Sequence, residues 1–212
     1  MKANKKNISI FIIWVVHISG LLGMLFYDLG FFAGFTSVNL FVMSTILFLN
    51  FKLNSRRQIL SILSIFLIGM IAESLGVNYD LIFGEYEYGN NLGFKLFGVP
   101  FLIGINWIIL TAISANIASF LTKNKNILLT VIIGALLMLT MDFVMEPIAP
   151  KLDMWRFKNL IVPSSNYIGW LIIGLLTQTI YNLLFREKEI IVSINLYAAF
   201  FLFFSFLNLI YA

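Results

Sequence analysis

Three carboxylate residues lie in segments of the chain that are otherwise apolar. Asp142 and Glu146 belong to the stretch GALLMLTMDFVMEPIAP, and Glu73 lies near the end of an earlier apolar run. A spacing of four residues places Asp142 and Glu146 on one face of a helix. Two carboxyl groups held close together in a low dielectric cannot both ionise cheaply, so one of them keeps its proton near neutral pH. Such a proton is available for general acid catalysis.

The position of each carboxylate along its apolar segment indicates whether a functional or a structural role is favoured. Ionisable side chains inside a membrane usually mark functional sites, which favours function for Asp142 and Glu73. Glu146 lies near a helix end, just before a proline. It could therefore cap loop amides or pair with Arg156 or Lys151 instead of taking part in chemistry.

Aromatic and amide side chains accompany these acids. Each aromatic residue alone is explained by a belt at the lipid headgroups, but together they would form a pocket whose π faces stabilise a developing cation. Asn106 and Asn166 are costly in lipid, so we expect internal hydrogen bonds that orient a carboxylate or a water, or that join helices. The aromatic candidates for substrate binding are Tyr86, Tyr88, Trp107, Trp155 and Trp170.

The composition indicates an integral membrane protein. Of 212 residues, 60% are hydrophobic and 11% are charged, and the mean hydropathy is +0.96. A soluble domain carries about a quarter charged residues. The chain has no cysteine and one histidine, so we expect no metal site and no cofactor. For His17 we expect a buried hydrogen bond to a neighbouring helix. The net charge of +4 needs no nucleic-acid partner, because the basic residues lie in short loops.

Seven segments are long and apolar enough to span a bilayer as helices, which takes about 20 residues each. The sequence thus predicts an all-α membrane protein with a single polytopic domain over residues 1–212. The first apolar run is interpreted as a retained helix, because no small-residue cleavage site follows it. The predicted spans are 8–26, 31–49, 58–76, 99–121, 126–147, 165–185 and 190–211.

Basic residues predict the orientation of these spans in the inner (cytoplasmic) membrane. Alternate termini and loops carry ten Lys and Arg residues on one side and four on the other, which predicts a cytoplasmic N-terminus and an outer C-terminus. The long loops 77–98 and 148–164 then face outward. The ten are Lys2, Lys5, Lys6, Lys52, Arg56, Arg57, Lys123, Lys125, Arg186 and Lys188, and the four are Lys95, Lys151, Arg156 and Lys158.

Two helical hairpins, at about 58–121 and 126–185, share a pattern. An acid is followed after thirteen residues by an aromatic-x-aromatic element, then by Val-Pro, and then by a tryptophan seven residues after the proline. Both hairpins run in the same direction, so the sequence predicts a parallel internal repeat with a pseudo-twofold axis along the membrane normal. A site between the copies would collect Glu73 from one and Asp142 with Glu146 from the other.

Acids and π faces with few other polar groups suit a hydrocarbon-like lipid substrate. An acid that protonates a carbon–carbon double bond leaves a tertiary carbocation, which either water or an internal alkene can capture. No Asp-rich motif for Mg²⁺ and a diphosphate is present in the sequence, which disfavours a prenyl-diphosphate transferase.

The order of Glu73, FGEYEY, GVP, NW, then Asp142, MWRF and VPSSNYIGW resembles the integral membrane carotenoid-biosynthesis proteins that include carotenoid 1,2-hydratases. The resemblance covers residues 72 to 170. It implies addition of water to the terminal double bond of an acyclic carotenoid end group, with Glu73, Asp142, Asn106 and Asn166 as site residues. Either Asp142 or Glu73 would be the proton donor, and Glu146 is added on its own chemistry.

A similar helical unit occurs in the heterodimer-type membrane lycopene cyclases, which MDFVMEP and MWRF also resemble. The paired glutamates expected after the later proline are replaced by VPSSN, which favours a hydratase over a cyclase. The segment FKNLIVP departs from the hydratase pattern, which would have a glycine and a tyrosine there, and leaves the choice of substrate open.

Two other classes of protein remain as alternatives. A non-enzymatic carotenoid-binding protein would need the aromatic residues but not the acids, and a proton-coupled transporter would need acids arranged across the membrane rather than near one face. Beyond the lipid substrate and the bilayer, association with other carotenoid-pathway enzymes is expected.

Overall fold

The computed structural model describes residues 4–51, 53–185 and 188–211. Within these ranges seven helices are long and apolar enough to cross a membrane, which confirms the all-α, multi-pass prediction. Three basic residues of the orientation argument, Lys2, Lys52 and Arg186, lie outside the described ranges. The helices are α1 Lys5–Phe26, α2 Leu29–Ala33, α3 Thr36–Asn50, α4 Arg56–Tyr79, α5 Phe101–Leu121, α6 Ile127–Met145, α7 Ser164–Leu184 and α8 Ile190–Tyr211.

The second span is not the single helix predicted over 31–49. It consists of the short α2 and the longer α3, which are separated at Gly34 and Phe35. Glycine is a poor helix former, and the Thr36 hydroxyl donates to the carbonyl of Ala33 at 2.7 Å across the break. The two helices together, Leu29–Asn50, still have the length and hydropathy of one membrane span.

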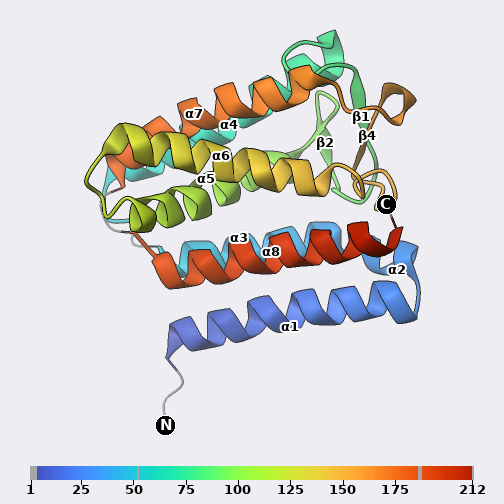
Figure 1. Ribbon diagram of the computed structural model, residues 1–212, viewed down its shortest axis with the longest axis horizontal. Coiled ribbons are helices and arrows are strands. Elements are labelled where there is room, and N and C mark those ends of the chain that lie inside the picture. Colours follow the sequence, from blue (N-terminus) through green and yellow to red (C-terminus); the bar gives the residue numbers. More distant parts are fainter. Residues whose placement is uncertain (1–3, 52, 186–187, 212) are drawn as a thin grey trace.

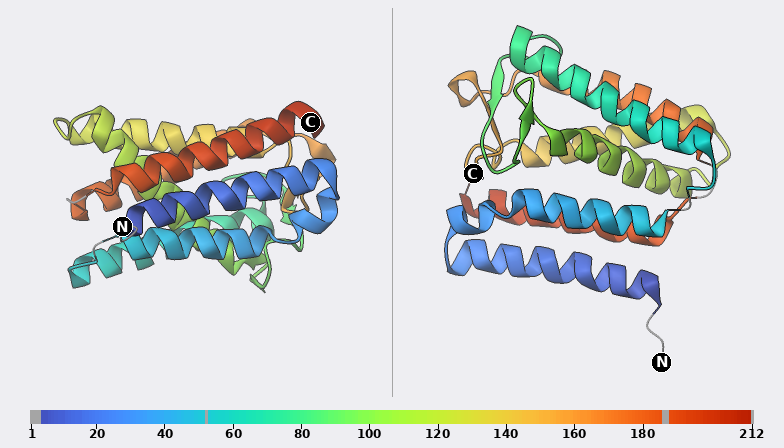
Figure 2. Two further views of the ribbon diagram at one scale, coloured as in Figure 1. Left: turned by 90° about the horizontal axis from the view of Figure 1, so that it is seen from below. Right: turned by 180° about the vertical axis from the view of Figure 1, so that it is seen from behind.

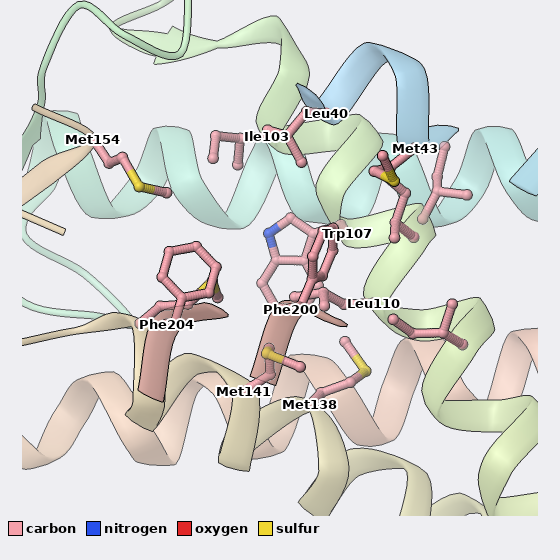
Figure 3. Close-up of a cluster of buried hydrophobic side chains, with 14 of the residues drawn as sticks. Leu40, Met43, Ile103, Trp107, Leu110, Met138, Met141, Met154, Phe200 and Phe204 are labelled. Atoms are coloured by element: carbon pink, nitrogen blue, oxygen red, sulfur yellow. The ribbon is translucent and has the colours of Figure 1, made fainter. Parts of the chain in front are cut away.

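Helix α5 lies at the centre of the molecule. It contacts α4, α6 and α7 on one side and α3 and α8 on the other, and most of its residues are buried. Figure 1 shows α4, α5, α6 and α7 as one group, with α3 and α8 and then α1 as further layers, and Figure 2 shows the same layers from below and behind. Figure 3 shows the apolar core where Trp107 and Leu110 of α5 meet Met138 and Met141 of α6.

The two long loops are joined at the end of the bundle opposite the N-terminus (Figure 1). Strand β1, Tyr86–Tyr88, pairs antiparallel with β4, Trp155–Phe157, so Tyr86 lies opposite Phe157 and Tyr88 lies opposite Trp155. A second small sheet joins β2, Lys95–Leu96, to β3, Val99–Pro100. The short 3-10 helix η1, Lys158–Leu160, follows β4.

The strands β1 and β4 are the aromatic-x-aromatic elements of the predicted repeat. Their pairing brings the two matched elements together, as an axis between two copies would require. The duplication itself stays a prediction.

Candidate active site

Glu73 of α4 is buried and accepts three hydrogen bonds. Its Oε2 accepts from the hydroxyls of Tyr86 at 2.5 Å and Tyr88 at 2.7 Å, and its Oε1 accepts from Nε1 of Trp107 at 2.9 Å. Hydrogen bonds donated to a carboxyl group favour its charged form. The three donors therefore offset part of the cost of burying a charge on Glu73.

The donors reach Glu73 because glycines on α4 leave room for them. A Cβ atom on Gly76 would lie 2.8 Å from the ring and hydroxyl of Tyr86, and one on Gly69 would lie 2.5 Å from the indole of Trp107. Burial raises the pKa of the Tyr86 and Tyr88 phenols well above that of an exposed tyrosine, and the nearby Glu73 charge raises it further. Both phenols therefore stay protonated and act as donors.

Asp142 and Glu146 form a pair at the end of α6, and their carboxyl groups contact each other. Nδ2 of Asn166, on α7, donates to Oδ2 of Asp142 at 2.9 Å and to Oε1 of Glu146 at 3.2 Å. Nε1 of Trp155 donates to Oε2 of Glu146 at 3.0 Å. Because the side chains of Asp142 and Glu146 are 1% and 5% exposed, the pair cannot easily carry two negative charges, and one shared proton resolves the repulsion.

One oxygen of this pair receives no hydrogen bond from an N–H or O–H donor of the described residues. Oδ1 of Asp142 is buried and has no hydrogen-bond partner among the described residues. Glu146 lies one residue beyond α6, and burial raises its pKa to about 7. The pair is thus able to hold a proton at neutral pH.

Aromatic rings form the walls of the site. The indoles of Trp107 on α5 and Trp170 on α7 stack with their ring centroids 4.4 Å apart and an angle of 15° between the rings. Phe83 lies against both indoles, with centroids 6.5 Å away in each case. The face-to-face contact joins the matched tryptophans of the two hairpins.

These side chains enclose one small space, which we name the acidic cavity. All ten candidate residues line it, together with Phe83, Ile103 and Phe157. Its volume is about 20 Å³, and a cavity needs roughly 10–15 Å³ to hold a water molecule. The cavity therefore has room for about one water between carboxyl groups and aromatic rings.

The structure decides several alternatives left open by the sequence. Arg156 pairs with Glu87 at 2.5 Å and not with Glu146, which is buried and accepts hydrogen bonds from Trp155 and Asn166. Asn166 orients the two carboxyl groups, whereas no side-chain hydrogen bond of Asn106 is found in the described part of the chain. The aromatic residues form a pocket wall and not only a belt.

The prediction that His17 forms a hydrogen bond to a neighbouring helix is wrong. Its Nδ1 lies 2.7 Å from the carbonyl oxygen of Ile13 in the same helix, not from a group on a neighbouring helix. The carbonyl lies one turn before His17, so the ring bonds back along α1 and packs against aromatic rings of α8.

Phe83 was missed by the sequence reasoning. It lies in an irregular loop, and the matching position of the other hairpin is Leu152, which is not aromatic, so neither periodicity nor the repeat marks it. Its place three residues before Tyr86 was the one available signal.

Comparison with known proteins identifies the family of the chain. Over residues 32–212 the chain matches the family described as carotenoid biosynthesis protein. A bisanhydrobacterioruberin hydratase of Haloarcula japonica is 29% identical over 138 residues, which make up 62% of this chain and 47% of that relative. The chain thus spans about half the length of the curated relative it matches. No solved structure matches the chain. Because the family match covers well over half of its length, this chain belongs to the carotenoid biosynthesis protein family.

Proposed function

We propose that this protein is a carotenoid hydratase, which adds water to the terminal double bond of an acyclic carotenoid end group. The observation that carries the proposal is the acidic cavity, where a proton-sharing pair of acids and a carboxylate held by three donors line a space for one water. Family membership supports the class of substrate, and the relative from Haloarcula japonica is a hydratase by name.

The first step is proton transfer from Asp142. Its unpartnered Oδ1 is the oxygen free to face an alkene. The proton adds to the less substituted carbon of the terminal double bond, and the π electrons form the new C–H bond. A tertiary carbocation is left on the neighbouring carbon, and the acid pair becomes fully ionised.

The aromatic walls stabilise this cation. Trp107, Trp170 and Tyr86 line the acidic cavity, and each ring contributes about 1–2 kcal/mol when the cation is desolvated. The negative charges on Glu73 and on the acid pair add to this stabilisation, because both act in a low dielectric.

Water then attacks the cation. The Asn106 side chain lines the cavity and is available to hold the water. As the C–O bond forms, Glu73 accepts a proton from the water, and a tertiary alcohol results. Return of this proton from Glu73 to the Asp142–Glu146 pair restores the site, so the net reaction is alkene plus water to alcohol.

Expression of the chain in bacteria that accumulate lycopene tests the proposal, with the pigments analysed by liquid chromatography and mass spectrometry. A product heavier by one water is expected. An isomer of unchanged mass would show that an internal alkene captures the cation, as in a cyclase. Unchanged pigment that co-purifies with the protein would indicate a binding protein, and unchanged pigment without binding would overturn the substrate class.

We further propose that the N-terminus faces the cytoplasm and that the acidic cavity lies toward the outer face of the cytoplasmic membrane. The absence of cysteine from the sequence allows a direct test. Lys151→Cys in the long loop should react with a membrane-impermeant maleimide in intact cells, whereas Lys125→Cys should react only after lysis. The reverse labelling pattern would invert the orientation.

A further inference from the structure

Phe83 lines the acidic cavity but has no side-chain group that can donate, accept or move a proton. Its side chain is 1% exposed, and the centroid of its ring lies 6.5 Å from that of Trp107, 6.5 Å from that of Trp170 and 6.3 Å from that of Tyr86. These are the three rings that stabilise the cation in the proposed mechanism. The phenyl ring of Phe83 therefore occupies space directly beside the place where the cation would form.

The backbone that carries this ring is strained. The N–H of Phe83 donates to the carbonyl of Leu81 at 2.8 Å, which closes a γ-turn, and Ile82 at the centre of the turn has a φ of 68°. A γ-turn with a positive central φ is rare and strained, and a β-branched residue is poorly suited to it. Such a conformation persists only where the surrounding contacts hold it. The position of Phe83 is therefore imposed by its contacts.

These contacts come from two helices. A Cβ atom on Gly76 of α4 would lie 3.2 Å from the ring of Phe83, and one on Gly169 of α7 would lie 2.9 Å from it, so both glycines leave room for the ring. The hydroxyl of Ser165, also in α7, donates to the carbonyl of Phe83 at 3.4 Å. Because α4 belongs to the first hairpin and α7 to the second, both hairpins hold this residue in place.

The matching residue of the second hairpin has different surroundings. Leu152 lies three residues before Trp155, as Phe83 lies three residues before Tyr86. Leu152 lines a separate cavity of about 340 Å³ between α1, α3, α5 and α8, and Phe83 does not line it. One residue of the matched pair therefore borders open space, whereas the other fills its own side of the site with a phenyl ring.

The acidic cavity communicates with this larger cavity on one side. Ile103, Asn106 and Trp155 line both cavities, so an extended chain can reach the acids from that side. Phe83 belongs to the part of the acidic cavity that the larger one does not share. Because the acidic cavity has a volume of about 20 Å³, it leaves no room for a chain that folds back on itself.

The available space decides what captures the cation. Water that attacks it forms a C–O bond and gives the alcohol. The nearest internal double bond of the chain can attack instead. Its π electrons then form a C–C bond to the cationic carbon, and the positive charge moves to the far carbon of that double bond. Glu73 takes a proton from a carbon next to the new cation, a double bond forms there, and return of the proton to the acid pair makes the net change an isomerisation.

We propose that Phe83 excludes this cyclisation, because its ring fills the space in which the new carbocycle would form. The proposal rests on the hydratase function and specifies it, since the site then takes an extended end group and leaves water as the nucleophile. The carbocycle is about the size of the phenyl ring. An empty apolar cavity stays dry and accepts hydrocarbon rings. Removal of the phenyl ring therefore creates a space that favours the folded chain over water.

Replacement of Phe83 by smaller residues tests the proposal through the products formed. The wild-type protein, Phe83→Leu and Phe83→Ala are expressed in bacteria that accumulate lycopene and have no cyclase. Liquid chromatography and mass spectrometry distinguish the alcohol, which is heavier by one water, from a cyclised isomer of unchanged mass. We expect the wild-type protein to form the alcohol alone. In Phe83→Ala the ratio of cyclised to hydrated product should rise at least about tenfold above the wild-type ratio or the detection limit, because the new space buries several carbons of the ring. Phe83→Leu should show a smaller rise.

Phe66→Ala is the matched control. Phe66 of α4 packs against Phe101 of α5, with ring centroids 5.0 Å apart, and does not line the acidic cavity. This variant should form the alcohol alone. Lost packing at either position lowers the amount of folded protein and of product, but only an enlarged reaction space creates a new product.

The alcohol as the sole product of both folded Phe83 variants would overturn the proposal. If Phe83→Ala does not accumulate in the membrane, the products of Phe83→Leu decide. Cyclised product from Phe66→Ala as well would also overturn it, because general loosening of the bundle would then be sufficient. A wild-type protein that forms no hydrated product would overturn the hydratase function itself, whichever products the variants form.

Discussion

The two groups of carboxylates in the acidic cavity are held in opposite ways. Glu73 receives three donors, two phenols and an indole. Asp142 and Glu146 contact each other and share the one amide of Asn166, and one oxygen of Asp142 receives no N–H or O–H donor from the described residues. Donors stabilise a carboxylate, whereas a second carboxyl group favours a retained proton. Residues of one chemical type are thereby prepared for two different tasks.

The difference follows from two positions of the matched hairpins. In the first hairpin the aromatic pair is Tyr86 and Tyr88, and both hydroxyls donate to Glu73. In the second hairpin the pair is Trp155 and Phe157, of which only the indole donates, and it donates to Glu146. In the proposed mechanism, one pattern of acid and aromatics therefore supplies the base in one hairpin and the acid in the other.

The largest expected effect comes from removing the proton donor. Asp142→Asn should lower the rate of hydration by about 10²- to 10⁴-fold, the usual contribution of a general acid, while the protein still binds pigment. Formation of the hydrated product in isolated membranes measures the rate. Asp80→Asn in the loop after α4 is the matched control, because its left-handed backbone, with φ of 58°, is one that asparagine also adopts readily. Hydration at the wild-type rate by Asp142→Asn would exclude the residue as the acid.

Glu73→Gln should cost less, about 10²-fold in rate, because water can attack a carbocation without a base. The amide also brings two donors of its own toward three existing donors, so we expect a loss of about 1–3 kcal/mol in the free energy of unfolding. Thermal unfolding in detergent and product formation separate the two effects. A greater loss of rate in Glu73→Gln than in Asp142→Asn would exchange the two roles.

The rate should also depend on pH. Burial raises the pKa of Glu146 to about 7, so above this pH the pair loses its proton and the rate falls about tenfold per unit. In the same way, the stabilising contribution of the raised pKa is fully present below about 4.5 and is lost as the pH rises to about 7. Rates measured from pH 5 to 9 test this, and Glu146→Gln should move or remove the decline. A flat profile in the wild-type protein would contradict the shared proton.

Removing a hydroxyl from the aromatic pair of the first hairpin, or adding one to the pair of the second, should change the rate of hydration less. Tyr88→Phe removes one donor from Glu73 and should lower the rate by about tenfold, as expected for one hydrogen bond to a charged group. Phe157→Tyr adds a hydroxyl donor to the acidic cavity and should shift the decline in rate to lower pH. If Tyr88→Phe left the rate unchanged, the donors around Glu73 would be structural only.

The smallest effect is expected at the rim of the site. Arg156 and Glu87 face each other across β1 and β4, and both side chains are largely exposed. Exposed ion pairs contribute less than about 1 kcal/mol, so Arg156→Gln should change the rate by less than about twofold. A large loss of activity would show that the charge of Arg156 acts on the acidic cavity.

The membrane spans could be predicted from the sequence because the requirement is local. Each helix needs about 20 apolar residues, whatever its neighbours are, and the predicted edges differ from the observed helices by a few residues. The break at Gly34 was missed, because one glycine in an apolar run does not reveal whether the helix is interrupted.

The ten candidate residues that line the acidic cavity could also be predicted from the sequence. The spacing of Asp142 and Glu146, the matched aromatic elements and the two tryptophans pointed to one place, since an acid inside a membrane needs partners. The sequence did not predict which donor bonds to which carboxylate oxygen. These contacts depend on side-chain rotamers and on the pairing of β1 with β4, and residue spacing specifies neither.

A larger cavity of about 340 Å³, which lies between α1, α3, α5 and α8, was decided by tertiary structure alone. Its walls come from α1, α3 and α8, whose apolar residues look the same in sequence whether they face lipid or a ligand. Hydropathy reports only that a side chain avoids water, and both surroundings satisfy it equally. Only the packing of helices distant in sequence could place His17 of α1 and Asn39 of α3 at one cavity.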